Sequence, residues 1–76
     1  MKYKYYAEAI TTASNEPVTK NWSTNHHGSP TDANAAKFIH NMQFSLDITN
    51  PGEKVIEVSV YETKTRKLLA SAKASQ

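Results

Sequence analysis

Residues 54–62, Lys-Val-Ile-Glu-Val-Ser-Val-Tyr-Glu, constrain the fold more strongly than any other part of the chain. Apolar and polar side chains alternate from Ile56 onward, so that Ile56, Val58 and Val60 lie on one side of an extended backbone. This pattern predicts a β-strand with one buried and one exposed face. Because a single strand cannot bury its apolar side, the rest of the chain must provide the elements that cover it.

Length and composition limit what those elements can be. The chain has 76 residues and no cysteine, which excludes disulfides, thiolate metal sites and cysteine catalysis. We expect a single domain over residues 1–76 with a small core and modest stability. The formal charge of +2 is only mildly basic. No apolar run has the length of a signal-peptide core or a membrane span. We therefore expect a cytoplasmic protein that is not associated with a membrane.

Two stretches before the middle of the chain predict a β-hairpin. Residues 2–12 alternate, and we expect four of their side chains to face the core: Tyr3, Tyr5, Ala7 and Ala9. Residues 13–17 have the composition of a turn that ends in Pro17. A short second strand over 18–23 should then return with Val18 and Trp22 facing inward.

The next segment predicts a helix. Residues 25–28 are expected to form a loop, and Ser29 and Pro30 then indicate a helix start, with Ser29 as the N-cap. Asp32 occupies the acidic position of a capping box. The helix is expected over about 30–43, with an apolar stripe on its inner side: Ala35, Phe38, Ile39 and Met42.

Residues 43–49 permit more than one interpretation. A longer helix would add Leu46 to the apolar stripe, whereas a strand would alternate through Phe44 and Ile48. The β-branched residues 48–49 and the turn at 50–52 argue against a long helix. We favour a helix that ends near Phe44 and an irregular connection over an extra short strand.

Residues 67–74 predict the last strand, which forms a hairpin with residues 54–62. Its expected inward side chains are Leu68, Ala70, Ala72 and Ala74. The element order is β-β-α-β-β. The predicted fold class is therefore α+β, a four-stranded antiparallel sheet with one helix packed on one face.

The sequence offers little for catalysis or metal binding. The candidate metal ligands are His26, His27 and His40, but adjacent side chains in extended backbone point apart and no His-x-x-x-His pair is present. With two glycines, the chain has neither a phosphate-binding loop nor a glycine-rich turn around a serine. Gly28 and Ser29 before the helix are explained by a plain loop and cap, with no need for an anion. We expect no enzyme, no metal and no cofactor.

The side of the sheet away from the helix is the candidate binding face. Eight residues are expected to carry any binding: Lys2, Lys4, Tyr6, Ile10, Tyr61, Lys67, Leu69 and Lys73. The outward Ile10 and Leu69 favour a protein partner or a homodimer. The alternative is a platform for single-stranded nucleic acid, which needs lysines interleaved with tyrosines. Glu8 and Glu57 on the same face make nucleic acid the second choice, and an ordinary solvated sheet would show the same pattern with no partner at all.

Three segments together resemble small phage and mobile-element proteins of β-β-α-β-β order: residues 2–6, residues 35–39, and the hairpin of 57–62 with 67–69. Anti-CRISPR inhibitors and other host-takeover factors belong to this group. The resemblance covers most of the chain in pattern and brings no shared functional residues with it. It implies a non-enzymatic protein that acts by binding, for example as an inhibitor of a host or defence protein.

Overall fold

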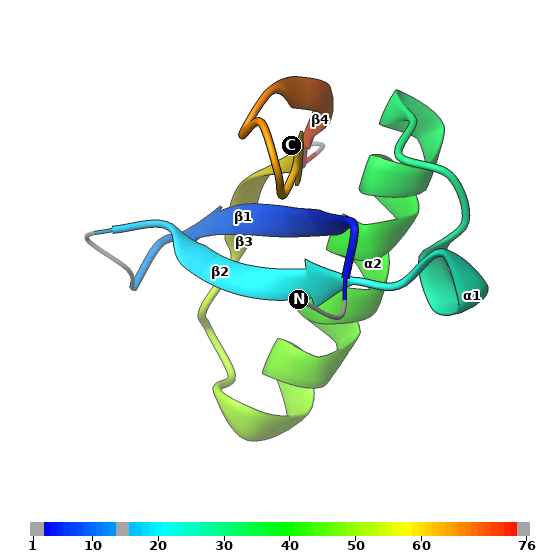
Figure 1. The fold of residues 1–76 in the computed structure, drawn as a ribbon. Coiled ribbons are helices and arrows are strands. Elements are labelled where there is room, and N and C mark those ends of the chain that lie inside the picture. Colours follow the sequence, from blue (N-terminus) through cyan, green and yellow to red (C-terminus); the bar gives the residue numbers. More distant parts are fainter. Residues whose placement is uncertain (1–2, 14–15, 75–76) are drawn as a thin grey trace.

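The computed structural model describes residues 3–13 and 16–74. The sheet has the order β2-β1-β3-β4, and each neighbouring pair is antiparallel. A long helix, α2, lies across one face of this sheet (Figure 1). This arrangement confirms the predicted α+β class and the single helix on one face, to which the structure adds one short helix. The elements are β1 (Tyr5–Thr11), β2 (Val18–Trp22), α1 (Thr24–His27), α2 (Asp32–Thr49), β3 (Val55–Glu62) and β4 (Leu68–Lys73).

The core is built from small and branched side chains on the covered face of the sheet. Val58 lies between Ala9 of β1 and Ala72 of β4, and Val60 is flanked by alanines in the same way. Short alanines let a helix approach the sheet closely, so the valines are covered directly by α2. The buried residues are Ala7, Ala9, Trp22, Ala35, Phe38, Ile39, Val55, Val58, Val60 and Ala70. They include six of the thirteen inward positions predicted for the strands and three of the four in the helix stripe, whose fourth, Met42, packs against them.

A β-bulge in β3 changes which side chains of the central strand face the core. Glu57 lies opposite Ile10, but the next partner pair is Val55 with Thr11, so Ile56 is an extra residue. An extra residue reverses the alternation beyond it. Val55 is consequently 2% exposed and Ile56 46% exposed, and the inward assignment of Ile56 was wrong.

A second bulge has the same effect in β4. Val60 lies opposite Ala70, whereas Tyr61 lies opposite Leu68, which makes Leu69 the extra residue. Leu68 therefore shares the side of Tyr61 and is 53% exposed, so its inward assignment was also wrong. Ala70 is buried as predicted, and Ala72 and Ala74 pack against the core.

Two inward assignments at the edges of the sheet were wrong for a different reason. Tyr3 precedes β1, which begins at Tyr5, and it is exposed. Val18 is on the side of Trp22, but it lies at the far end of an edge strand, where no part of α2 covers it. The predicted turn over 13–17 includes residues 14–15, which lie outside the described residues.

The connection from β2 to α2 is organised by Trp22 and Gly28. The indole Nε1 of Trp22 donates to the carbonyl oxygen of Gly28 at 2.9 Å, and the ring of Trp22 stacks on Phe38 with centroids 5.2 Å apart. Residues 25–27, part of the loop predicted over 25–28, lie in the single turn α1 (Thr24–His27). Gly28 follows with a φ of 78°, in the left-handed region that favours glycine.

The N-terminus of α2 differs from the prediction. The N-cap is Thr31, whose Oγ1 accepts from the backbone N–H of Asn34 at 3.2 Å, so the Ser29 cap and its capping box were wrong. Ser29 contributes its carbonyl oxygen, to which Asn34 Nδ2 donates at 2.8 Å. Asp32 reaches the sheet, where its Oδ1 accepts from the backbone N–H of Ser71 on the edge strand β4 at 3.0 Å.

α2 continues to Thr49, so both the ending near Phe44 and the extra strand were wrong. Leu46 packs against the core and Gln43 holds the following connection in place. The longer helix places Phe44 and Ile48 on its outer side, where they are 67% and 69% exposed. Packing and side-chain hydrogen bonds thus outweigh the low helix propensity of residues 48–49.

Candidate binding face

The face of the sheet away from α2, the open face, carries a continuous apolar row. Tyr6 on β1 lies opposite Tyr61 on β3, and Tyr61 lies opposite Leu68 on β4. The two tyrosine rings are stacked, with centroids 5.3 Å apart and an angle of 18° between their planes. These three residues form what we call the Tyr–Tyr–Leu row. Sequence alternation could not find Leu68, because its orientation depends on the bulge at Leu69.

The other end of the open face is mixed in character. Ile10 lies opposite Glu57, and Glu57 lies opposite Lys73, so that an apolar, an acidic and a basic side chain are neighbours. A row containing Glu8 and Ser59 separates them from the Tyr–Tyr–Leu row. Ile10 and Lys73, both expected to carry binding, therefore lie on the same face as Tyr6 and Tyr61 but are not adjacent to them.

Basic residues lie beyond the Tyr–Tyr–Leu row, at one end of the sheet. The backbone N–H of Thr63 donates to the carbonyl oxygen of Lys4 at 2.8 Å, which fixes the β3–β4 turn beside the start of β1. Lys4, Arg66 and Lys67, which we call the basic rim, are all exposed at this end of the sheet. Arg66 is a member of this group that sequence analysis missed, because the turn geometry could not be predicted.

Two residues of the predicted binding set remain, Leu69 and Lys2. Leu69 is exposed at the bulge of β4, and Lys2 lies outside the described residues. The structure thus brings together Lys4, Tyr6, Tyr61 and Lys67 out of the predicted set, and it adds Leu68 and Arg66.

A second exposed apolar surface is formed by Phe44 and Ile48. They are four residues apart in α2 and so lie one turn apart on the same side of the helix. Ala35, Phe38 and Ile39 face the core, and a 3.6-residue period places Phe44 on the opposite side of the helix. This pair is therefore remote from the open face of the sheet.

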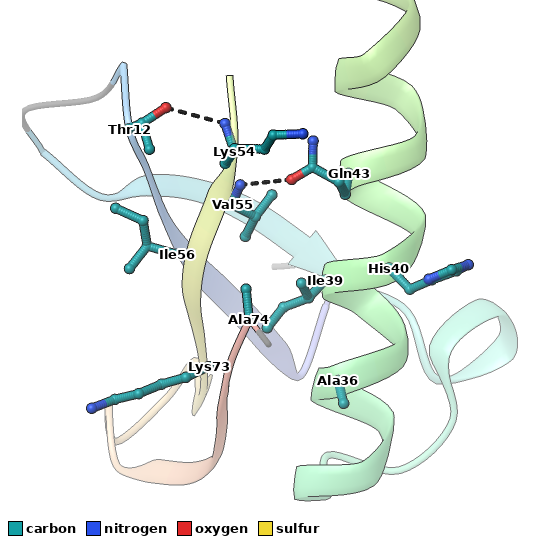
Figure 2. Close-up of a pocket in the computed structure, with 10 residues that line it drawn as sticks. All are labelled: Thr12, Ala36, Ile39, His40, Gln43, Lys54, Val55, Ile56, Lys73 and Ala74. Carbon is teal, nitrogen blue, oxygen red and sulfur yellow. Dashed lines mark hydrogen bonds between the residues drawn. The ribbon is translucent and has the colours of Figure 1, made fainter. Parts of the chain in front are cut away.

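One hollow, of about 680 Å³, lies between α2 and the β3–β4 side of the sheet (Figure 2). Figure 2 shows two of its polar side chains, His40 and Lys73, extending away from each other. The side-chain amide of Gln43 already has hydrogen-bond partners within the chain. Its Oε1 accepts from the N–H of Val55 at 2.8 Å, and its Nε2 donates to the carbonyl oxygen of Glu53 at 2.9 Å. The groove offers no set of groups arranged around a common reacting atom.

The histidines take different positions. His27 packs against Trp22 and Phe38, with ring centroids 5.0 and 4.9 Å away, and burial, together with the neighbouring His26, lowers the pKa of His27. His40 is exposed on α2. Across residues 3–13 and 16–74, no three His, Asp or Glu side chains are grouped as a metal ion would need.

In the part of the chain that the structure describes, none of the helices combines the length and the apolar character needed to cross a membrane. Searches with protein-family models, against curated proteins and against solved structures gave no match. The surface features that bear on function are thus the Tyr–Tyr–Leu row and the basic rim of the open face.

Proposed function

We propose that this protein is a non-enzymatic binding protein that docks the open face of its sheet on another protein in the cytoplasm. The observation that carries the proposal is the Tyr–Tyr–Leu row, an apolar surface that crosses three neighbouring strands. Tyrosine and arginine are enriched at the energetically important centres of protein interfaces. Here a tyrosine pair is already held in one geometry by its own stacking, so little side-chain freedom is lost on binding.

The charges around the row indicate the kind of partner. Lys4, Arg66 and Lys67 are exposed, and the nearby Glu62 accepts a hydrogen bond from Thr65 Oγ1 at 2.6 Å. An apolar centre with a basic rim fits an apolar pocket surrounded by acidic residues. Covering such a pocket is how an inhibitor of a host or defence protein would act, which is the mode of action implied by the resemblance to phage proteins.

The proposal is tested by affinity capture from a nuclease-treated lysate of the cells that produce the protein, with substitutions on opposite sides of the molecule. Leu68→Glu places a negative charge within the Tyr–Tyr–Leu row, at its β4 end, and should abolish capture of the specific partner. Phe44→Glu is the matched control, because Phe44 is at least as exposed but lies on the outer side of α2. We expect the control to capture the partner as the wild type does.

Two results would contradict the proposal. One is a partner retained by Leu68→Glu and lost by Phe44→Glu, which would move the contact to the helix. The other is a partner that is lost on nuclease treatment, which would show that nucleic acid bridges the two proteins. Circular dichroism of both variants checks that each remains folded.

A further inference from the structure

A second, smaller hollow lies on the open face next to the Tyr–Tyr–Leu row. It has a volume of about 290 Å³ and is formed by β1, β2 and the β3–β4 turn. Tyr6 and Asn21 line it from the sheet, and Thr63 and Arg66 line it from the turn. This volume approaches the lower end of the range for small-ligand sites.

One feature of the turn is left without a structural explanation by the folded chain. The Oγ1 atom of Thr63 is buried and has no hydrogen-bond partner among the described residues. Buried hydroxyls are nearly always paired, so an unpaired one at the wall of a hollow indicates a missing partner. Arg66 has a φ of 61°, in the left-handed region that arginine seldom adopts. The hairpin loop accounts for this conformation, because the N–H of Arg66 donates to the carbonyl oxygen of Glu62 at 2.7 Å and the N–H of Glu62 donates to that of Lys67 at 2.9 Å. The loop thereby brings Arg66 to the wall of the hollow.

The chemistry of the hollow selects the ligand class. Tyr61 covers one ring face of Tyr6, and Asn21 is the neighbour of Tyr6 on its other side, so the second ring face of Tyr6 is turned toward the hollow. An uncovered ring face stacks on a planar group. The guanidinium of Arg66 favours a phosphate. Lys4 is close to this turn, because its backbone carbonyl oxygen accepts from the N–H of Thr63. The amide of Asn21 and the carboxylate of Glu8 can pair with the edge of a base.

We propose that this hollow binds one nucleotide unit, with its base stacked on Tyr6, its phosphate at Arg66 and an oxygen of the sugar or phosphate bonded to Thr63 Oγ1. The inference goes beyond the proposed protein contact and does not depend on it. A free nucleotide and an exposed nucleotide of a single strand share this chemistry, and the experiment below distinguishes them.

The test is fluorescence anisotropy with a labelled ten-nucleotide single strand of mixed sequence at low salt, with unlabelled GMP, AMP and UMP as competitors. We expect a Kd of about 10⁻⁴–10⁻⁶ M that weakens steeply with added salt. Competition by a mononucleotide assigns the site to a free nucleotide. Binding of the strand without such competition assigns it to a single strand.

The decisive variant is Arg66→Gly. Glycine accepts a φ of 61° without strain, so this change removes the guanidinium without threatening the fold. We expect affinity to fall about tenfold or more and the salt slope to decrease by about one. Lys73→Ala is the matched control, because it removes one positive charge from the far end of the same face. It should change affinity less than about threefold.

Thr63→Val separates ligand binding from folding. Valine has nearly the shape of threonine but lacks the unpaired hydroxyl, so the variant should be at least as stable as the wild type. Its affinity for the strand should nevertheless fall. The proposal is overturned if neither the strand nor the mononucleotides bind at millimolar concentration. It is also overturned if Lys73→Ala weakens binding as much as Arg66→Gly, or if a poly-glutamate peptide binds as tightly as the strand.

Discussion

Val58→Ala tests the packing of the core most directly. Val58 is fully buried, and its neighbours across the sheet are the alanines Ala9 and Ala72. The substitution removes two methyl groups, which costs about 1.6 kcal/mol at about 0.8 kcal/mol for each. Because neither alanine has a side chain long enough to move into the space, the cavity remains and adds about 1 kcal/mol. We therefore expect a loss of about 2–3 kcal/mol in the free energy of unfolding.

Urea unfolding followed by circular dichroism measures this loss. Trp22, the one tryptophan in the sequence, gives a second signal through its fluorescence, and both should report the same transition. Ile48→Ala is the control, because Ile48 is exposed on α2 and the substitution should change stability by less than about 0.5 kcal/mol. A loss of stability for Val58→Ala that is as small as that of the control would contradict this packing. It would show that Val58 is not buried between Ala9 and Ala72 beneath α2.

Three further predictions concern other parts of the molecule. Gln43→Ala should cost about 1–3 kcal/mol in urea unfolding, because the N–H of Val55 loses its acceptor, whereas Gln43→Glu retains an acceptor oxygen and should cost less. The lowered pKa of His27 means that the unfolded chain binds a proton near pH 6.5 while the folded chain resists it, so stability should fall as the pH is lowered below about 6.5. Urea midpoints between about pH 5 and 8 should show this slope, and His27→Phe should largely remove it. When no other partner is present, two copies of the protein should associate through their Tyr–Tyr–Leu rows. Sedimentation velocity at about 100 µM should then show a dimer for the wild type and a monomer for Leu68→Glu.

The sequence predicted those parts of the fold that depend on regular periodicity. Alternation placed Ala7, Ala9, Val58 and Val60 in the core, and the helical stripe placed Phe38 there. Each of these residues lies in a segment where one period continues without interruption. The element order follows from them, because one helix between two hairpins leaves few other ways to cover both valines.

The errors arose where a single residue or a distant contact decides the structure. One extra residue in β3 and one in β4 turned Ile56 and Leu68 outward, and a bulge has no signature in alternation. The length of α2 depends on contacts of Gln43 and Leu46 with parts of the chain that are distant in sequence. Local propensity cannot report such contacts.

The candidate binding face was predicted only in part for the same reasons. Tyr6 and Tyr61 were identified because both lie on regular stretches of their strands. Their stacking depends on the register between β1 and β3, and the presence of Leu68 beside them depends on the bulge at Leu69. The position of Arg66 depends on a turn without glycine, in which the sequence does not indicate the left-handed residue.

The pairing of β1 with β3 also bears on the order of events during folding. Each hairpin can form from neighbouring residues, but the sheet joins the two hairpins through β1 and β3. The ends of these strands are linked by contacts such as Lys54 with Thr12, 42 positions apart. Closing so long a segment is slow compared with forming a hairpin or a helix. Until it closes, both central strands have unpaired backbone groups, and the valines of β3 are uncovered. Ala9 and Val58, which face each other across this seam, should therefore govern the rate of folding, while residues of β2 should mainly govern the rate of unfolding.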